Sequence, residues 1–216
     1  MTKTRESPYL WATWLPKLIA GEDHCFWKAW FKAHFTEYEK LQDDSFDLGR
    51  WTADHAFMVY ERAKRLRDEG YEVAVEGQNK FYLETRAGAT LSGQPDIVAK
   101  RDADLLIVDC KTGRPRYSDK VQVLIYMLVW PHVRPEADGM EMRGEIEYST
   151  KSIDIPIADA DEGFRQAVRY LITDIAGARE LARVPCFDEC EYCDISAADC
   201  PARVTEQLQP IVVDLF

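Results

Sequence analysis

The chain reads Leu105-Leu106-Ile107-Val108-Asp109-Cys110-Lys111 near its centre, and this stretch decides the expected fold. Four consecutive aliphatic residues bounded by turn residues are typical of a buried strand. Side chains two positions apart on a strand point to the same face, so Asp109 and Lys111 project together and Cys110 points away. Upstream, Gly93-Gln94-Pro95-Asp96 ends a neighbouring apolar stretch, and its carboxylate can arrive beside them. Two carboxylates and an ammonium favour a site for a hard divalent cation, with the ammonium left for a phosphate or a water.

A second pair of polar residues follows on the next predicted element. Asp-x-Lys by itself is better explained as a surface ion pair at a strand end, so the rest of the pattern matters. Residues 121–130 have helical character, and the i to i+4 spacing of Gln122 and Tyr126 puts both side chains on one helix face. Upstream, Gly49-Arg50-Trp51-Thr52-Ala53-Asp54-His55 lies on a helix predicted over residues 47–69. A lone helical His is more often a surface residue than a metal ligand.

Taken together, Gly-x-x-Asp, Asp-x-Lys and Gln-x-x-x-Tyr resemble the motif series of the PD-(D/E)XK nucleases in their RecB-like form. The segment that contains His55 resembles the motif in which a helical His joins the metal site of that family. The resemblance implies an α/β fold, a restriction-endonuclease-like core in which helices flank a central mixed sheet. It also implies a Mg²⁺ or Mn²⁺ site formed by His55, Asp96, Asp109 and the backbone carbonyl of Cys110. The catalytic residues that it implies are Asp96, Asp109, Lys111, Gln122 and Tyr126.

The six cysteines carry a further resemblance; they are Cys25, Cys110, Cys186, Cys190, Cys193 and Cys200. The Cys-x2-Cys pair and the third thiol after it give three ligands on one C-terminal loop and leave one vacancy. This layout resembles the iron–sulfur exonucleases associated with CRISPR systems, where a lone N-terminal Cys joins a C-terminal trio around a 4Fe–4S cluster. The implied ligands are Cys25, Cys190, Cys193 and Cys200, and the cluster would join the N-terminal helices to the Cys-rich loop. Cys186 can replace Cys190 or be a bystander, and the spacing equally permits a structural zinc.

Composition limits the size and class of the protein. The 216 residues are 46% hydrophobic, enough for one substantial core. We therefore expect a single nuclease domain over 1–216, with an N-terminal helical part (1–45), a nuclease core (46–183) and a Cys-rich segment (184–216). A signal peptide and an 18-residue apolar run are both missing from the sequence, which predicts a cytoplasmic protein that does not enter membranes. Clustered cysteines in such a protein favour metal binding over disulfides.

The formal net charge of −11 argues against DNA binding at first sight, because neutralised phosphates supply most of that affinity. Net charge says nothing about local distribution, however. Arg114, Arg116 and Lys120 follow Lys111 closely and are predicted to track a DNA backbone. A second basic group, made of Arg62, Lys64, Arg65 and Arg67, is better explained as a solvated helix face.

The remaining elements are predicted from periodicity and turn residues. Residues 1–45 are expected to be helical, with most of their aromatic side chains packed around Cys25. Short strands separated by turns are expected to form a meander: Tyr71–Glu76, Phe81–Arg86, Leu91–Lys100 and Asp104–Lys111. A helix (Tyr117–Trp130), a strand pair (Glu145–Ser149 and Ser152–Ile157) and an amphipathic helix (Ala160–Arg183) complete the pattern.

These features predict a metal-dependent deoxyribonuclease that hydrolyses phosphodiester bonds. The resemblance implies an exonuclease on single-stranded DNA, while the sequence itself leaves exo- versus endonuclease activity and strand preference open. The resemblance implies a role in CRISPR spacer acquisition and antiviral defence beside integrase proteins, or in DNA repair beside a helicase. Two alternatives remain: a non-catalytic, nuclease-like subunit that binds DNA or a partner, and a zinc-stabilised protein without a nucleic-acid role. The C-terminal Asp214-Leu215-Phe216 resembles bacterial sliding-clamp ligands, although the Gln expected at the start of such a peptide is absent.

Overall fold

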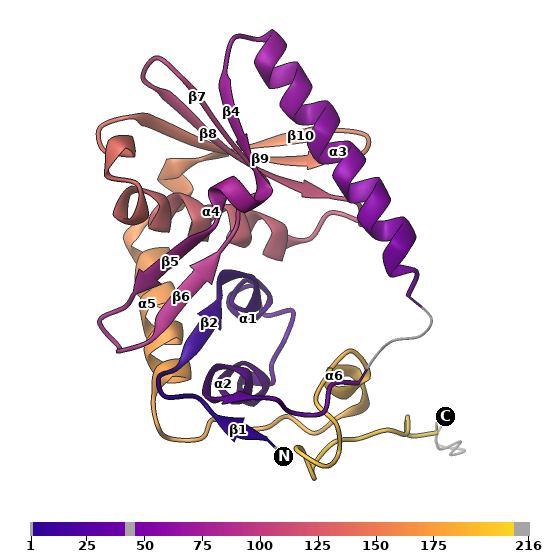
Figure 1. Ribbon diagram of the computed structural model, residues 1–216. Coiled ribbons are helices and arrows are strands. Elements are labelled where there is room, and N and C mark those ends of the chain that lie inside the picture. The colour runs from indigo at the N-terminus through magenta and orange to yellow at the C-terminus, as the bar shows by residue number, and fades with distance from the viewer. Residues whose placement is uncertain (1, 42–45, 210–216) are drawn as a thin grey trace, which may run out of the picture.

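A five-stranded mixed sheet forms the centre of the computed structural model, which describes residues 2–41 and 46–209 (Figure 1). Its strands are β4 (Glu72–Val75), β7 (Ile97–Arg101), β8 (Asp104–Lys111), β9 (Glu141–Tyr148) and β10 (Ser152–Pro156). The spatial order is β10-β9-β8-β7-β4, with β8 and β9 parallel and the other neighbours antiparallel. The predicted α/β class with a mixed sheet flanked by helices is therefore confirmed.

Alternating side chains of β7 and β8 serve two different hydrophobic clusters, as the two faces of a strand require. Helix α3 (Leu48–Asp68) covers one face, where it packs on Leu106, Val108 and Cys110. Helices α4 (Tyr117–Val133) and α5 (Glu162–Ala176) belong to the cluster on the other face, which includes Leu105 and Ile107. Figure 1 shows α3 lying diagonally across the sheet, on the side away from α4. The sheet is thus covered on both faces.

Helix α4 lies very close to β9, and a glycine permits this approach. A Cβ atom added at Gly144 would come within 2.3 Å of Val123 Cγ1 and 2.7 Å of Met127 Sδ, both on α4. Such contacts are far inside van der Waals distance, so any side chain at this position would push the helix away from the sheet. The close packing fixes α4, which carries Gln122 and Tyr126, against the central strands.

The N-terminal part differs from the prediction. Only α1 (Pro16–Ile19) and α2 (Phe26–His34) are α-helices there, together with the 3₁₀ helix η1 (Ala12–Trp14). The short strands are β1 (Lys3–Thr4), β2 (Tyr9–Trp11) and β3 (Phe35–Thr36). The expectation of a helical segment over 1–45 is therefore wrong in part, because β2 finds a parallel partner, β6 (Thr90–Gly93), about 80 positions along the chain.

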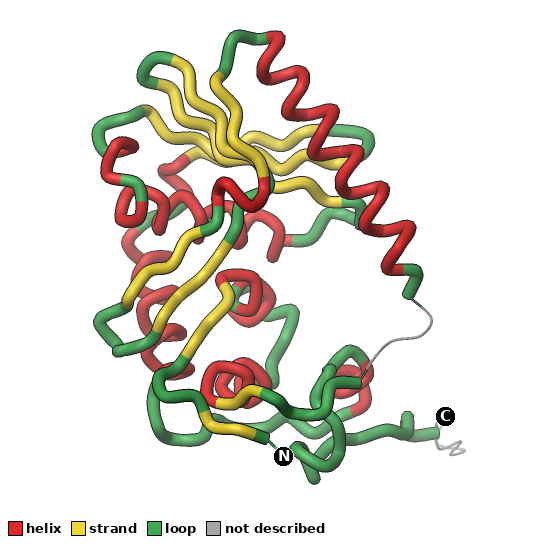
Figure 2. Tube along the Cα trace, in the orientation of Figure 1, coloured by secondary structure: helices red, strands yellow, loops and turns green. Residues whose placement is uncertain are grey.

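The predicted strand Leu91–Lys100 is divided in two, and the predicted meander with it. Strand β6 pairs with β2 and with β5 (Phe81–Glu84) in a separate three-stranded sheet, while β7 joins the main sheet (Figure 2). The break falls at 94–96, where Pro95 supplies no N–H for a sheet ladder. As a result, Asp96 stands on a connection between two sheets instead of in the middle of a strand.

The other predicted helices and strands are present with shifted ends; β9, for example, begins at Glu141, four residues before the predicted strand. Helix α3 begins after Asp47, whose side chain accepts a hydrogen bond from Arg50 N, and is followed by Gly70 at φ 87°. Helix α5 ends at Ala176, before Gly177, and so is shorter than predicted. The remaining elements are the 3₁₀ helices η2 (Glu76–Asn79), η3 (Pro135–Ala137) and η4 (Ile157–Asp159) and the short helix α6 (Phe187–Glu191).

Helices of the described residues are all too short or too polar to cross a membrane. The clamp-like tail Asp214-Leu215-Phe216 lies outside the described residues, so that prediction stays untested.

Candidate active site

Asp109 and Lys111 form the centre of the site at the end of β8. Lys111 Nζ lies 2.6 Å from Asp109 Oδ2, and the two side chains project to the same face as their spacing predicts. Asp109 is only 2% exposed, yet its Oδ2 atom receives no hydrogen bond of directed geometry from the described residues. A buried carboxylate oxygen held only by an ion pair keeps lone pairs free for a further partner.

Gln122 on α4 connects this pair to the helix. Its Nε2 donates to Asp109 Oδ1 over 2.8 Å, and its Oε1 accepts a hydrogen bond from Lys111 Nζ over 3.1 Å. The same amide nitrogen lies 3.2 Å from the hydroxyl oxygen of Tyr126, which in turn donates to the carbonyl of Gln94 at 3.4 Å. One helix face thus orients both charged groups of β8, because Gln122 and Tyr126 are one turn apart.

Asp96 approaches the same point from the connection between β6 and β7. Its Oδ2 accepts hydrogen bonds from the backbone N–H of Cys110, at 2.7 Å, and from His55 Nε2 on α3, at 3.3 Å. The backbone group of Cys110 that contacts the site is therefore its N–H. That its carbonyl oxygen binds the metal stays a prediction. The thiol of Cys110 points away into the cluster under α3, where burial raises its pKa.

Burial and neighbouring charges shift the pKa values of these groups. Burial raises the pKa of Asp109 to about 6, although the ammonium of Lys111 opposes this rise. Burial alone would lower the pKa of Lys111, but the Asp109 carboxylate outweighs it and the net shift is upward. The hydrogen bond to Asp96 raises the pKa of His55. At neutral pH the Asp109–Lys111 pair is therefore ionised.

A cavity of about 570 Å³ joins these residues to the surface. The residues that line it include Trp51 of α3, Phe46, which precedes that helix, and His55, Asp96, Asp109, Lys111, Gln122 and Tyr126. A second cavity of about 240 Å³ adjoins it and is lined by Lys17, Arg114 and Arg116 among others. Lys120, also predicted to contact DNA, lines neither cavity and is paired with Asp159 Oδ2 at 2.8 Å.

The donors at the centre suit a hard divalent cation, which prefers carboxylate oxygens. Asp96 and Asp109 face one cavity, and Asp109 Oδ2 is free of directed hydrogen bonds. Among the described residues, however, no group of three or more His, Cys, Asp and Glu side chains is gathered closely enough to hold a metal ion. A cation here would compete with Lys111 for Asp109 and with His55 for Asp96.

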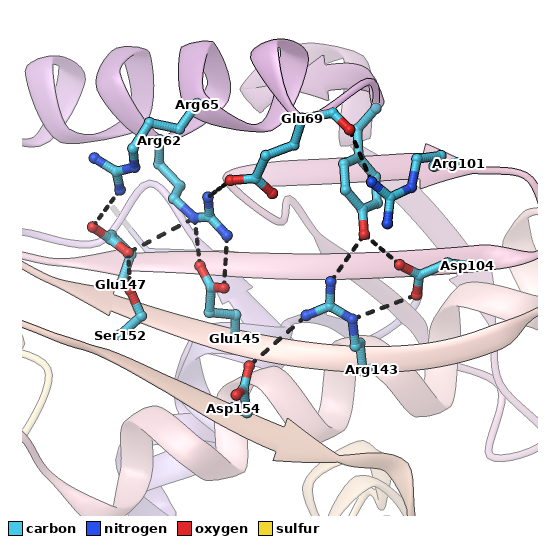
Figure 3. Close-up of polar contacts among 11 residues, drawn as sticks. Arg62, Arg65, Glu69, Arg101, Asp104, Arg143, Glu145, Glu147, Ser152 and Asp154 are labelled. Carbon is cyan, nitrogen blue, oxygen red and sulfur yellow. Dashed lines mark hydrogen bonds and ion pairs between the residues drawn. The ribbon is translucent and has the colours of Figure 1, made fainter.

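The helix that carries His55 is fixed to the sheet by a buried ion pair. Figure 3 shows Arg62 reaching from α3 to Glu145 on β9, with Arg65 and Glu147 beside them. Arg62 Nε and the Nη2 nitrogen donate to the two Glu145 oxygens over 2.6 and 2.8 Å, a bidentate arrangement. Because Arg62 is 8% exposed, the prediction of a solvated basic face is wrong for this residue.

The predicted cluster ligands Cys25, Cys190, Cys193 and Cys200 are free thiols, and in the described part of the chain they do not come together in a group of three or more that could hold a metal. Cys25, Cys193 and Cys200 pack against a cluster formed by Trp27, Trp30, Phe31 and Ile195. Cys190 Sγ accepts a hydrogen bond from the N–H of Val204 at 3.4 Å. The carboxylate of Glu189 accepts hydrogen bonds from the N–H groups of His24 and Cys25, which holds the upstream Cys beside the C-terminal loop. Cys186 is exposed.

Three residues at or beside the site, Asn79, Trp51 and Phe46, have no role in the sequence predictions. Asn79 is buried and donates from Nδ2 to the carbonyls of Ala74 and Pro95, both at 3.1 Å, so it fixes the connection that carries Asp96. The sequence indicates only that Asn79 lies in a turn, because no local pattern distinguishes an exposed turn Asn from one whose side chain fixes a neighbouring loop. Trp51 was part of the His55 motif without a role of its own.

The fold and this constellation define a class of protein, and comparison identifies the family. The chain belongs to the PD-(D/E)XK nuclease superfamily, whose model matches residues 19–201, a range that contains every candidate site residue. Membership indicates a nuclease with DNA as its substrate. The solved structure titled "Crystal structure of SSO0001" is similar over 94% of this chain and 90% of that one, with a TM-score of 0.52 and 18% identity. That likeness shows the fold alone. None of the curated proteins matches the chain.

Proposed function

We propose that this protein is a metal-dependent deoxyribonuclease, an exonuclease on single-stranded DNA, and that 1–216 act as one nuclease domain. The observation that carries the proposal is the convergence of Asp96, Asp109, Lys111 and Gln122 from three elements on one open cavity. An ion pair with no further task would not require a lysine, two carboxylates and a bridging amide around a cavity. Such a set suits phosphodiester hydrolysis, in which charge develops on the phosphate.

Each residue of the site has a part in the proposal. His55, Asp96 and Asp109, with the Cys110 carbonyl, would hold Mg²⁺ or Mn²⁺. When bound, the cation supplies Lewis-acid chemistry, since it polarises the scissile phosphate and activates water. Lys111 orients the attacking water and offsets the negative charge of the transition state. Gln122 is a positioning residue that keeps Lys111 turned toward Asp109, and Tyr126 supports Gln122 in turn.

The test of this proposal is a cleavage assay with the anaerobically purified full chain. Single- and double-stranded DNA carrying a label at either end would be incubated with Mg²⁺, with Mn²⁺ or with EDTA. We expect metal-dependent shortening of single-stranded DNA from an end, faster than of the duplex, and no cleavage in EDTA. Binding of DNA without cleavage in any metal would favour the alternative of a non-catalytic subunit.

For the cysteines we propose a structural 4Fe–4S cluster held by Cys25, Cys190, Cys193 and Cys200, with zinc as the alternative. The support is the four free thiols, three of which (Cys25, Cys193 and Cys200) pack against one aromatic cluster, and the hydrogen bonds of Glu189 to the N–H groups of His24 and Cys25. The cluster would tie the N-terminal part to the C-terminal segment. The resemblance to CRISPR-associated exonucleases supports spacer acquisition with integrase proteins as the pathway, or repair with a helicase.

Cys25→Ala should remove the cluster and much of the stability, because the cluster closes a loop of 190 − 25 = 165 residues. Fresh protein should be brown, with iron and sulfide in comparable amounts, and the variant colourless. Cys186→Ala and Cys110→Ala are the matched controls, since one thiol is exposed and the other faces the sheet core. Colourless parent protein with stoichiometric zinc would refute the iron–sulfur assignment and leave the nuclease proposal intact.

A further inference from the structure

We propose that Phe46 and Trp51 form a stacking platform for one unpaired base of a single-stranded DNA substrate, next to the scissile phosphate. The inference rests on the proposed nuclease function, because it takes Asp96 and Asp109 as the place of that phosphate. It adds the residues that select single strands and the path that the strand takes across the site.

The two rings form an aromatic strip that ends at the reaction centre. Trp51 stacks on His55 with ring centroids 5.3 Å apart and planes 20° from parallel, and Phe46 lies 6.3 Å from Trp51. Trp51 and His55 are one helical turn apart on α3, so the backbone holds them in register. His55 in turn hydrogen-bonds to Asp96, so His55 is the only residue between the ring of Trp51 and this carboxylate along the chain of contacts.

Both aromatic side chains are accessible to a ligand. Trp51 is 41% exposed and Phe46 is 52% exposed, whereas Trp27 and Trp30 of α2 are buried in a cluster. Exposure alone does not assign a role to an aromatic side chain, so the place of these two rings carries the argument. Both rings line the same cavity as Asp96 and Asp109, and a ring face in such a place is available to a flat ligand.

The far side of the groove suits the sugar–phosphate backbone. The two cavities share Thr13, Lys111, Gly113 and Gln122 as lining residues, so they form one continuous groove. Its second part is lined by the three cations Lys17, Arg114 and Arg116 and by one carboxylate, Asp119, in a chain whose net charge is −11. Cations gathered here, against the overall charge, are what backbone phosphates require. A strand would thus run from the aromatic strip, across the carboxylates, into the basic part.

This arrangement selects single strands for a physical reason. In a duplex both faces of a base are covered by its neighbours, whereas an unpaired base can offer a whole face to an aromatic side chain. Stacking is tolerant of sequence because every base has such a face. We therefore expect a preference for strand form with little preference for sequence.

The test is a binding experiment on the full chain with Ca²⁺ in place of Mg²⁺, so that affinity is read without cleavage. The probe is a fluorescein-labelled oligothymidylate of twelve nucleotides, together with a set in which one position at a time is abasic. Trp51→Ala should weaken binding of the intact oligomer roughly 5- to 140-fold, the range for one stacked base. Trp51→Phe should restore most of the affinity.

The abasic set separates stacking from mere support of His55. At one position, loss of the base should weaken binding by the parent protein and have no further effect on Trp51→Ala. Tyr60→Ala is the matched control, because Tyr60 is 60% exposed on the same helix and lines neither cavity. Equal effects of every abasic position on parent and variant would overturn the platform, as would a parent that does not bind single strands. If the base at that position is coupled to Trp51 but DNA is cleaved in neither Mg²⁺ nor Mn²⁺, the nuclease proposal alone is refuted.

Discussion

Asp109→Asn should abolish DNA cleavage and change the unfolding temperature by less than about 4 °C, the shift that roughly 1 kcal/mol gives in a chain of this size. The amide keeps the shape of Asp109 but loses the charge that a divalent cation and Lys111 require. Two opposing effects keep stability nearly unchanged. Burial raises the pKa of Asp109 to about 6, so above that pH the native state bears the cost of a buried charge, which the amide removes. Against this, Lys111 loses its partner.

Lys111→Ala should lower the single-turnover rate with Mn²⁺ on the order of 10²–10³-fold, the usual effect of removing one transition-state partner. Lys100→Ala is the matched control, because Lys100 is an exposed lysine on the neighbouring strand β7, near the end of that strand opposite to Asp96.

The metal affinity of the parent should also weaken as the pH falls through about 6, because protonation of Asp109 competes with the cation. Cleavage by Asp109→Asn at near the parent rate would show that the site is wrongly assigned.

Local periodicity explains what the sequence could predict of this site. Asp109 and Lys111 share a face because strand side chains alternate, and Gln122 and Tyr126 share one because a helix turns every 3.6 residues. Both rules act within a few residues, and the structure agrees with both. The order of the motifs also predicted the PD-(D/E)XK nuclease superfamily, which the match over residues 19–201 confirms, while the RecB-like and iron–sulfur exonuclease form stays a prediction.

Long-range pairing explains what the sequence could not predict. Strand β2 is extended because β6 lies beside it, and the 91–100 stretch is divided because its two halves join different sheets. Arg62 sits among other basic residues of α3, which is the ordinary sign of a solvated face. Its partner Glu145 is 83 positions further along the chain, and no local pattern connects the two.

Arg62→Ala should destabilise the protein by about 3–5 kcal/mol, the typical cost of leaving one member of a buried pair without its partner. Glu145 is itself buried and would keep an uncompensated charge between α3 and the sheet. The change is measurable as a lower urea midpoint with an unchanged m-value. Arg67→Ala is the matched control, since Arg67 is exposed on the same helix. A loss below about 1 kcal/mol would mean that the pair is a surface contact in solution.

The double variant Arg62→Met, Glu145→Leu distinguishes stability from positioning. Well-packed apolar residues replace a buried ion pair with little or no loss of stability, because the desolvation cost disappears with the charges. Arg62 is seven residues, about two turns, from His55 on the same helix, so the pair also sets where the His55 ring stands over Asp96. We therefore expect the double variant to recover most of the urea midpoint but to bind Mn²⁺ more weakly than the parent. Parent-like metal affinity would show that the hydrophobic cluster under α3 is sufficient to hold His55 in place.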